Sequence, residues 1–365
     1  MRCALIAALC LVPATQAAPV PLPKKVNVEV VFCLDTTGSM SGLIDGAKAK
    51  IWSICNQIAS GKPTPDLKVG LVAYRDKGDA YVTKVTDLSS DLDAIHKELK
   101  TYTADGGGDE PEHVNQALYD AVHKIKWSAD KKTLKIVFLV GDAAPHMDYT
   151  DDVKYPETCK KAVEKGIIIN TVLCGTSDSA KKAWVDISDK AKGSFVAIPQ
   201  DGGVVIARTP FDEKMEKLNG ELTKTVLVWG GREKQQADRE KNEASLGLKG
   251  DSAAGRIAYQ AKNAQAAAYC LADQVKRGEV KLEAIKKEEL PAELKKLDLK
   301  GQKEYLKKLD DKRADLNKQV LELDKERSAW IAKKTAEEAK KGKGGFDVKV
   351  LEVLRKQAKG FELDY

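Results

Sequence analysis

Apolar runs that alternate with helical segments occupy residues 26–198, and this alternation constrains the fold more than any other feature. Runs typical of buried strands lie at Val26–Leu34, Leu67–Tyr74, Tyr81–Leu88, Leu134–Val140, Ile167–Cys174 and Phe195–Ile198. Segments with helical periodicity separate them, at Gly42–Ala59, Leu92–Leu99, Pro111–Lys126, Tyr155–Lys165 and Ala180–Ala191. Apolar strands separated by amphipathic helices predict a doubly wound α/β domain, in which a mostly parallel sheet is covered on both faces.

The pattern changes after about Gly202. Pro210–Val228 is expected to form a helix that closes the first domain, and no strand-like run follows it. Further helices are expected at Ser252–Arg277, from Pro291, at Gln302–Lys341 and at Val348–Gln357. We therefore predict an α/β domain over residues 24–230 and an α-helical, coiled-coil-like domain over residues 233–365.

The longest predicted helix carries a heptad seam. Leu309, Leu316, Leu323 and Trp330 recur every seven residues, which is typical of a coiled coil. Arg313 and Arg327 interrupt the second seam position, so we expect this helix to pack against other helices of the chain.

Charge argues against nucleic acid as a partner. The net charge of +6 comes entirely from residues 201–365, where 36 basic and 30 acidic side chains are interleaved. Interleaved charges of this kind usually cover a solvated helical surface, and no basic stripe with interspersed aromatic residues occurs.

The first residues resemble a secretory signal peptide. Arg2 precedes the apolar run Ala4–Val12, and small residues follow up to a predicted cleavage point after Ala17 or Ala18. The run is too short to span a membrane, and no later segment is long enough. We expect a soluble protein that is secreted or periplasmic, with residues 1–18 removed. Five cysteines would remain, and one disulfide among them is possible.

Oxygen-bearing side chains follow two of the central strands. Asp35, Thr37 and Ser39 come directly after the first strand, and Asp142 follows the strand Leu134–Val140. The stretch GGGDEPE between them supplies Asp109, Glu110 and Glu112. Because the carboxyl ends of parallel strands meet at one sheet edge, these loops are expected to converge. Clustered carboxylates repel one another unless a cation neutralises them, and oxygen ligands suit magnesium, calcium or manganese. An ordinary strand–helix turn capped by Ser39 or Ser41 is the simpler alternative.

The motif DxTGS after a first apolar strand resembles the von Willebrand factor type A domain and its metal-ion-dependent adhesion site. The resemblance implies that Asp35, Thr37, Ser39 and Asp142 are metal ligands. The middle loop departs from the usual threonine and is similar to the loop of integrin β-subunit I-like domains. That register implies Glu112 as the remaining ligand. The segment VGLVAYRDK also resembles these domains, which implies a possible second cation site at Asp76 and Asp109.

The function implied is that of an exported, non-enzymatic adhesion or scaffold protein. One divalent cation, magnesium in the first place, would hold an acidic side chain of a partner protein. One alternative is a metal-dependent hydrolase, for which His146 is the available base. Another is a structural module in which the helical domain does the binding.

Overall fold

The computed structural model describes residues 26–108, 110–203, 208–263, 269–339 and 345–365. The predicted signal peptide lies outside these residues. A six-stranded sheet forms the centre of the molecule, with the strand order β3-β2-β1-β4-β5-β6. Its strands are β1 (Asn27–Asp35), β2 (Asp66–Tyr74), β3 (Thr83–Ser89), β4 (Leu134–Gly141), β5 (Ile167–Cys174) and β6 (Phe195–Ile198).

The sheet is parallel except for the edge strand β3, which pairs with β2 in the antiparallel sense. The strand β1 lies between β2 and β4, so the strand order reverses at β1. In open α/β sheets a crevice forms at this position, outside the carboxyl ends of the strands. The predicted doubly wound fold is confirmed, and Asp35 lies at the crevice because it is the last residue of β1.

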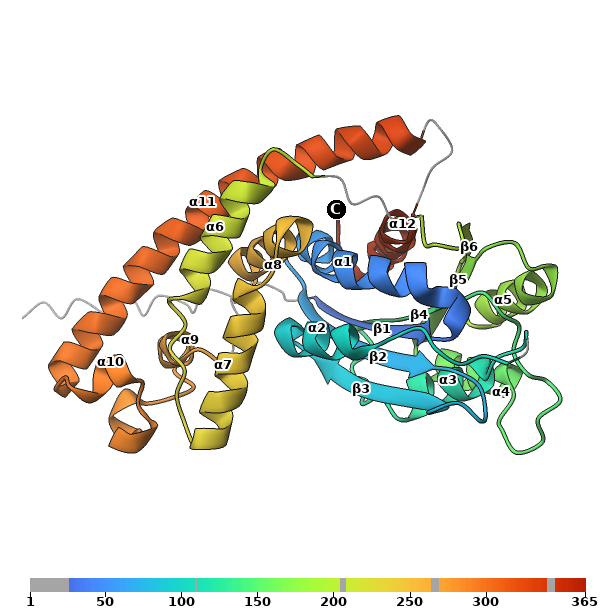
Figure 1. Cartoon of the computed structure of the whole chain (residues 1–365), viewed down its shortest axis with the longest axis horizontal. Coiled ribbons are helices and arrows are strands. Elements are labelled where there is room, and N and C mark those ends of the chain that lie inside the picture. The colour runs from blue at the N-terminus through green and yellow to red at the C-terminus, as the bar shows by residue number, and fades with distance from the viewer. Residues whose placement is uncertain (1–25, 109, 204–207, 264–268, 340–344) are drawn as a thin grey trace, which may run out of the picture.

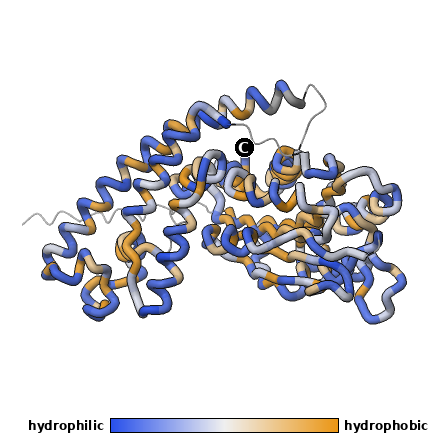
Figure 2. The backbone as a smooth tube through the Cα atoms, viewed as in Figure 1, coloured by the Kyte–Doolittle hydropathy of each residue, from blue (hydrophilic) through white to orange (hydrophobic). Residues whose placement is uncertain are grey.

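Helices cover both faces of the sheet (Figure 1). One face carries α1 (Ser41–Ile58), α2 (Leu92–Thr101) and α12 (Phe346–Ala358). The other carries α3 (Val114–His123), α4 (Tyr155–Glu164) and α5 (Asp178–Lys190). Figure 2 shows that hydrophobic residues concentrate along the central strands. The remaining helices are α6 (Asp212–Thr223), α7 (Arg232–Leu246), α8 (Gly250–Lys262), α9 (Leu271–Lys276), α10 (Ala292–Lys295) and α11 (Leu299–Ala339).

The helix that covers the sheet after β6 is α12, and the prediction that Pro210–Val228 closes the first domain is wrong. The helix there, α6, packs with α8 and α11 through Met215 and Leu222. By contrast, Phe346 of α12 is buried against Phe32 of β1, with ring centroids 6.1 Å apart. The Phe346 N–H donates to the Gly202 carbonyl oxygen at 2.9 Å. The chain therefore leaves the sheet after β6 and returns to it with its last helix.

Two predicted helix bounds also need correction. The helix expected over Ser252–Arg277 is two helices, because α8 ends at Lys262 and Asn263 has extended backbone angles. The helix expected from Pro111 begins at Val114 instead. Glu112 stays extended because its N–H donates to the Ala144 carbonyl oxygen at 2.9 Å and its own carbonyl accepts from the His146 N–H at 3.1 Å. This pairing binds the middle loop to the loop after β4.

The long helix α11 packs on α6, α8 and α9 of the same chain, as the interrupted seam predicted. Leu316 and Val320 are buried there. The two arginines of the seam make ion pairs: Arg313 with Asp273 at 2.8 Å, and Arg327 with Asp212 at 2.9 Å and with Asp251. Arg327 is buried and Arg313 half-buried, and guanidinium groups removed from water need such partners, which explains arginine at seam positions.

No helix among the described residues has the length and apolar character needed to span a membrane. All five cysteines of the described chain are buried as free thiols, so the possible disulfide is not present.

Candidate metal centre

The first loop of the site turns sharply around the Asp35 carboxylate, which is fully buried. Its Oδ1 accepts from the Thr37 N–H at 2.9 Å and from the Thr37 hydroxyl at 2.6 Å. The Gly38 N–H donates to the Gly106 carbonyl oxygen at 3.1 Å, which binds this loop to the middle loop. The residue at the N-cap of α1 is Met40, and no side chain caps the helix. Helix capping by Ser39 or Ser41 therefore does not account for the hydroxyl groups.

The strand ends beside this loop approach one another closely at Gly141. A Cβ atom added there would lie 2.4 Å from the Tyr74 hydroxyl oxygen and 2.9 Å from Asp35 Oδ2. Only glycine fits at such distances, so Gly141 allows β1 and β4 to deliver their aspartates side by side. Asp142 follows directly and is half-buried, and its Oδ2 accepts from the Gln200 amide at 2.6 Å.

The middle loop brings Glu112 to the same place. Its side chain is buried, and an added Cβ at Gly107 would lie 3.0 Å from Glu112 Oε1 and 3.1 Å from Thr37 Cβ. Gly107 also has a φ of 78°, a conformation that favours glycine. The small size of Gly107 lets Glu112 lie next to the first loop.

A pocket of about 420 Å³ opens where the three loops meet. Four of the predicted ligands line it, namely Thr37, Ser39, Glu112 and Asp142. The fifth, Asp35, lies fully buried beside them. Sequence reasoning missed Gln200 and Ser177, which also line the pocket. Both follow sheet strands at the same edge, β6 and β5, so the rule that located Asp142 could have found them.

Two buried carboxylate oxygens at this pocket have no hydrogen-bond partner in the described part of the chain. Asp35 Oδ2 and Glu112 Oε2 are buried and accept no hydrogen bond from any described residue. Burial, with a smaller contribution from Asp142, raises the pKa of Asp35 to about 7. Burial and the negative charge of Asp35 raise the pKa of Glu112 to about 9. Buried carboxylates of this kind need a counter-charge to ionise, and a hard divalent cation fits them.

A complete ligand shell is not assembled from carboxylates alone. Among the described residues, no group of three or more His, Cys, Asp and Glu side chains is arranged to hold a metal ion. A cation bound here would therefore rely on the hydroxyl groups of Thr37 and Ser39 and on water. Asp142 would also exchange its hydrogen bond with Gln200 for the cation. The integrin-like ligand set accordingly stays a prediction.

The predicted second site is only partly described, because Asp109 lies outside the described residues. Asp76 is buried, and its Oδ2 accepts from the Tyr149 hydroxyl at 2.7 Å while its Oδ1 has no hydrogen-bond partner among the described residues. His146 Nε2 lies 3.5 Å from Asp76 Oδ2, and His146 Nδ1 lies 2.8 Å from Asp148. His146 also stacks on Tyr149, so it holds the loop after β4 and does not line the pocket.

These observations define an α/β protein with a candidate cation pocket at the switch point of its sheet. The family model described as "von Willebrand factor A domain" matches residues 29–208. This stretch of the chain is a von Willebrand factor A domain.

Similarity to individual proteins covers smaller shares of the chain. The human von Willebrand factor A domain-containing protein 7 is 34% identical over 114 residues, which are 31% of this chain and 12% of that protein. The N-acetyltaurine hydrolase of Bos taurus is 30% identical over 100 residues, which are 27% of each chain. This chain thus spans about an eighth and about a quarter of the two relatives.

Two solved structures match parts of this chain at low identity. The SpRpn10 VWA domain is 14% identical, with a TM-score of 0.37, and the match covers 48% of this chain and 89% of that one. Proximal thread matrix protein 1 from the mussel byssus, with a zinc-occupied metal-ion-dependent adhesion site motif, is 16% identical with a TM-score of 0.39. That match covers 48% of this chain and 43% of that one.

Proposed function

We propose that this protein is a divalent-cation-dependent protein-binding protein of the adhesion or scaffold type, and that it is exported. The cation is held by Asp35, Thr37, Ser39, Glu112 and Asp142, with magnesium as the expected ion. The supporting observation is the pair of buried oxygens Asp35 Oδ2 and Glu112 Oε2, which have no hydrogen-bond partner among the described residues and lie beside an open pocket. Von Willebrand factor A domains commonly bind proteins through a metal, which fits this arrangement.

Each loop has a separate task in the proposed mechanism. The Thr37 N–H and hydroxyl hold one oxygen of Asp35, which leaves the other oxygen for the ion. Glu112 approaches from the middle loop, and Asp142 from the end of β4. The bound cation would supply a positive charge with an open coordination position for a carboxylate of the partner. Three carboxylates lower that positive charge, so we expect firm retention of the ion and modest attraction for an acidic ligand.

Thermal melts with magnesium and with a chelator test the cation site. At a magnesium concentration of about a hundred times the dissociation constant, the free energy of unfolding should rise by about 2.7 kcal/mol. Glu112→Gln should abolish most of this increase. Asp45→Asn, which alters an exposed carboxylate of α1, should leave it unchanged. Unshifted melts with magnesium, calcium and manganese would contradict the proposal.

The register of the middle loop has its own test. Glu112→Ala should weaken magnesium binding more than Asp109→Ala does, because Glu112 is buried beside Thr37. Titration calorimetry measures both variants, and the reverse order would show that Asp109 is the ligand.

Partner binding and export need separate experiments. Capture of a protein from the native extract should require magnesium and should be lost with a chelator or in Glu112→Gln. For export, mass spectrometry of the protein from its native host should find an amino terminus after Ala17 or Ala18. An intact Met1 would contradict export.

A metal-dependent hydrolase is the second candidate, and the similarity to N-acetyltaurine hydrolase over 100 residues favours it. Metal-activated hydrolysis needs a general base near the ion. The described residues that line the pocket include no histidine, since His146 is bound to Asp76 and Asp148 instead. We therefore propose a non-enzymatic role. Magnesium-dependent turnover of ester, amide or phosphate substrates would overturn it.

A further inference from the structure

The amino-terminal edge of the sheet, opposite the candidate metal centre, carries a basic pocket of about 610 Å³. It lies between the segment after α3 and the turn from α4 into β5. Four lysines line it, Lys126, Lys131, Lys135 and Lys165, together with the single acidic residue Glu164. The half-buried Trp127 and the buried Thr133 form part of the wall. The pocket has no part in the proposed cation site.

Lys135 gives this pocket an unusual charge. The residue lies on β4 and is only 5% exposed. Its ammonium group donates to the Lys165 carbonyl oxygen at 3.3 Å, and it makes no ion pair within the described parts of the chain. Glu29 is its cross-strand neighbour on β1, but the Glu29 oxygens bind Lys68 at 3.5 Å and the Ser128 N–H at 2.9 Å. A buried ammonium with three donors and one weak acceptor is costly unless an anion accompanies it.

Two further lysines are also without a carboxylate partner in the described chain. The Lys165 ammonium donates only to the Val122 carbonyl oxygen, at 2.7 Å, and Lys131 is exposed. The other charges of the pocket are already paired, Lys126 with Asp87 at 3.2 Å and Glu164 with Lys161 at 2.8 Å. The pocket therefore holds three lysines that make no ion pair with any described side chain.

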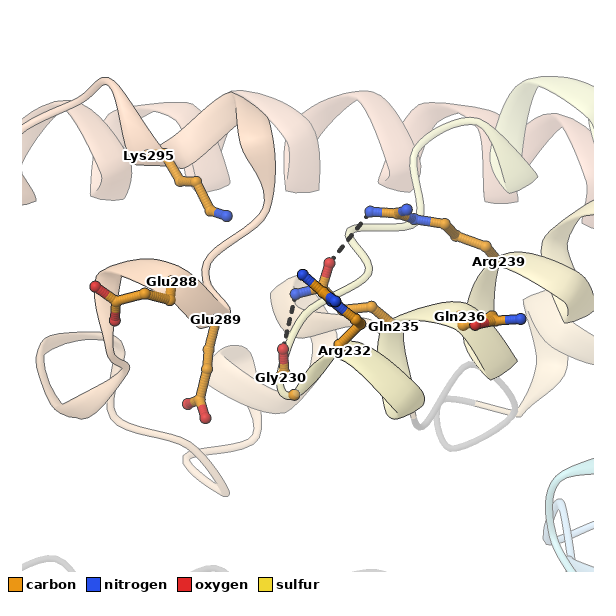
Figure 3. A pocket seen from close by; sticks show the side chains of 9 residues that line it. Gly230, Arg232, Gln235, Gln236, Arg239, Glu288, Glu289 and Lys295 are labelled. Carbon is orange, nitrogen blue, oxygen red and sulfur yellow. Dashed lines mark hydrogen bonds between the residues drawn. The ribbon is translucent and has the colours of Figure 1, made fainter.

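A larger pocket, at the start of α7, has no such excess of positive charge. It measures about 680 Å³ and is lined by charges of both signs, including Arg232, Arg239, Glu288 and Glu289 (Figure 3). Arg232, Arg239 and Glu288 are exposed and Glu289 is half-buried, so water can reach these charges. Nothing in that pocket requires a ligand.

We propose that the pocket around Lys135 binds a tetrahedral oxyanion, a phosphate or a sulfate, either free or as the monoester of a small molecule. Charge-assisted hydrogen bonds from lysine ammonium groups are strong, and a tetrahedral anion offers acceptors in several directions to Lys131, Lys135 and Lys165. The pocket is larger than the anion alone, which leaves room for an esterified group beside Trp127.

A purely structural role makes a different prediction. Lys135 and Lys165 donate to carbonyl oxygens near the ends of α4 and α3, where the helix dipoles favour cations. If the lysines serve only this purpose, no anion should bind saturably.

Backbone amide NMR of the intact protein can test the proposal. Sodium phosphate, sodium sulfate and sodium acetate are titrated up to tens of millimolar at constant ionic strength, followed by phenyl phosphate. We expect phosphate and sulfate to shift the amides of residues 126–135 and 165–166 saturably. Tighter binding of phenyl phosphate than of phosphate would identify a monoester as the ligand, and equal binding would identify the free anion.

Variants then assign the effect to the lysines. Lys135→Met should weaken binding by at least about tenfold, since a charge-assisted hydrogen bond is lost. Lys131→Met alters an exposed side chain, so the fold is not at risk, and it should weaken binding severalfold. Lys181→Met, on the exposed side of α5, is the control and should bind as the parent does. The proposal fails if no amide shift saturates, if acetate binds as well as phosphate, or if Lys131→Met and Lys135→Met bind like the control.

Discussion

At the scale of single residues, Asp35 and Glu112 should determine how the metal centre responds to pH. Burial raises both pKa values, to about 7 for Asp35 and about 9 for Glu112. The folded state therefore retains protons that the unfolded state has lost once the pH exceeds the ordinary carboxyl pKa. Without a cation, the stability should fall as the pH rises from about 4 to about 9.

Magnesium should counteract this loss, because the ion binds the ionised carboxylates and competes with protons. We expect the magnesium-induced rise in melting temperature to be small at pH 5 and larger at pH 8. Melts in chelator and in magnesium across this range measure it. In Glu112→Gln the chelator curve should become flatter. A stabilisation by magnesium that does not change with pH would contradict the assignment of these carboxylates.

At the scale of elements, the contact between α8 and α1 depends on one glycine. A Cβ atom added at Gly255 of α8 would lie 2.8 Å from the Ser53 backbone nitrogen and 2.9 Å from the Trp52 carbonyl carbon. Alanine is the better helix former by about 1 kcal/mol, but the clash is with backbone atoms that cannot rotate away. Gly255→Ala should therefore lower the free energy of unfolding by about 1–3 kcal/mol.

Gly220 of α6 is the matched control, because an added Cβ there meets nothing within 4 Å. Gly220→Ala should raise the free energy of unfolding by up to about 1 kcal/mol. Denaturant titrations compare the two variants. If Gly255→Ala were as stable as the parent, the close packing of α8 on α1 would be wrong.

At the scale of the whole molecule, the helical region is inserted between β6 and α12 and includes the helices α6 to α11. An added Cβ at Gly203 would lie 3.3 Å from the Cα of Gly345, so the described chain leaves and returns at one point. None of the residues identified at the candidate metal centre comes from residues 208–339. A variant that joins Gly203 directly to Gly345 should therefore fold and keep the magnesium response, although α1 loses its cover by α8.

The complementary truncation, which removes residues 345–365, should fail to fold. It strips the buried Phe346, Val350 and Leu354 from the sheet. Loss of one buried phenylalanine side chain costs about 3–5 kcal/mol, a large part of the stability of a typical domain. Circular dichroism and thermal melts compare the two variants. A folded joined variant without a magnesium response, or a truncated chain that melts like the parent, would contradict this organisation.

The pattern of apolar and polar residues along the chain was sufficient to predict the sheet and the helices that cover it. The strands β1, β4 and β5 consist mostly of apolar residues, and apolar runs separated by amphipathic helices have few stable arrangements other than a covered parallel sheet. That topology also brings Asp35 and Asp142 to one edge, because parallel strands end on the same side. The convergence of the loops could therefore be inferred from order along the chain.

Packing between residues far apart in the sequence decided which helix covers the sheet and which charged and polar side chains pair. The sequences of α6 and α12 are both amphipathic, and only the contact of Phe346 with Phe32 shows which helix covers the sheet. The partners of Arg327 and Gln200 lie 115 and 58 residues away along the chain. The buried ammonium of Lys135 depends on how Glu29 is shared between its neighbours. Sequence periodicity indicates which side of a helix or strand is buried. Which other element covers that side depends on the relative free energies of whole folded arrangements, so only the tertiary structure shows it.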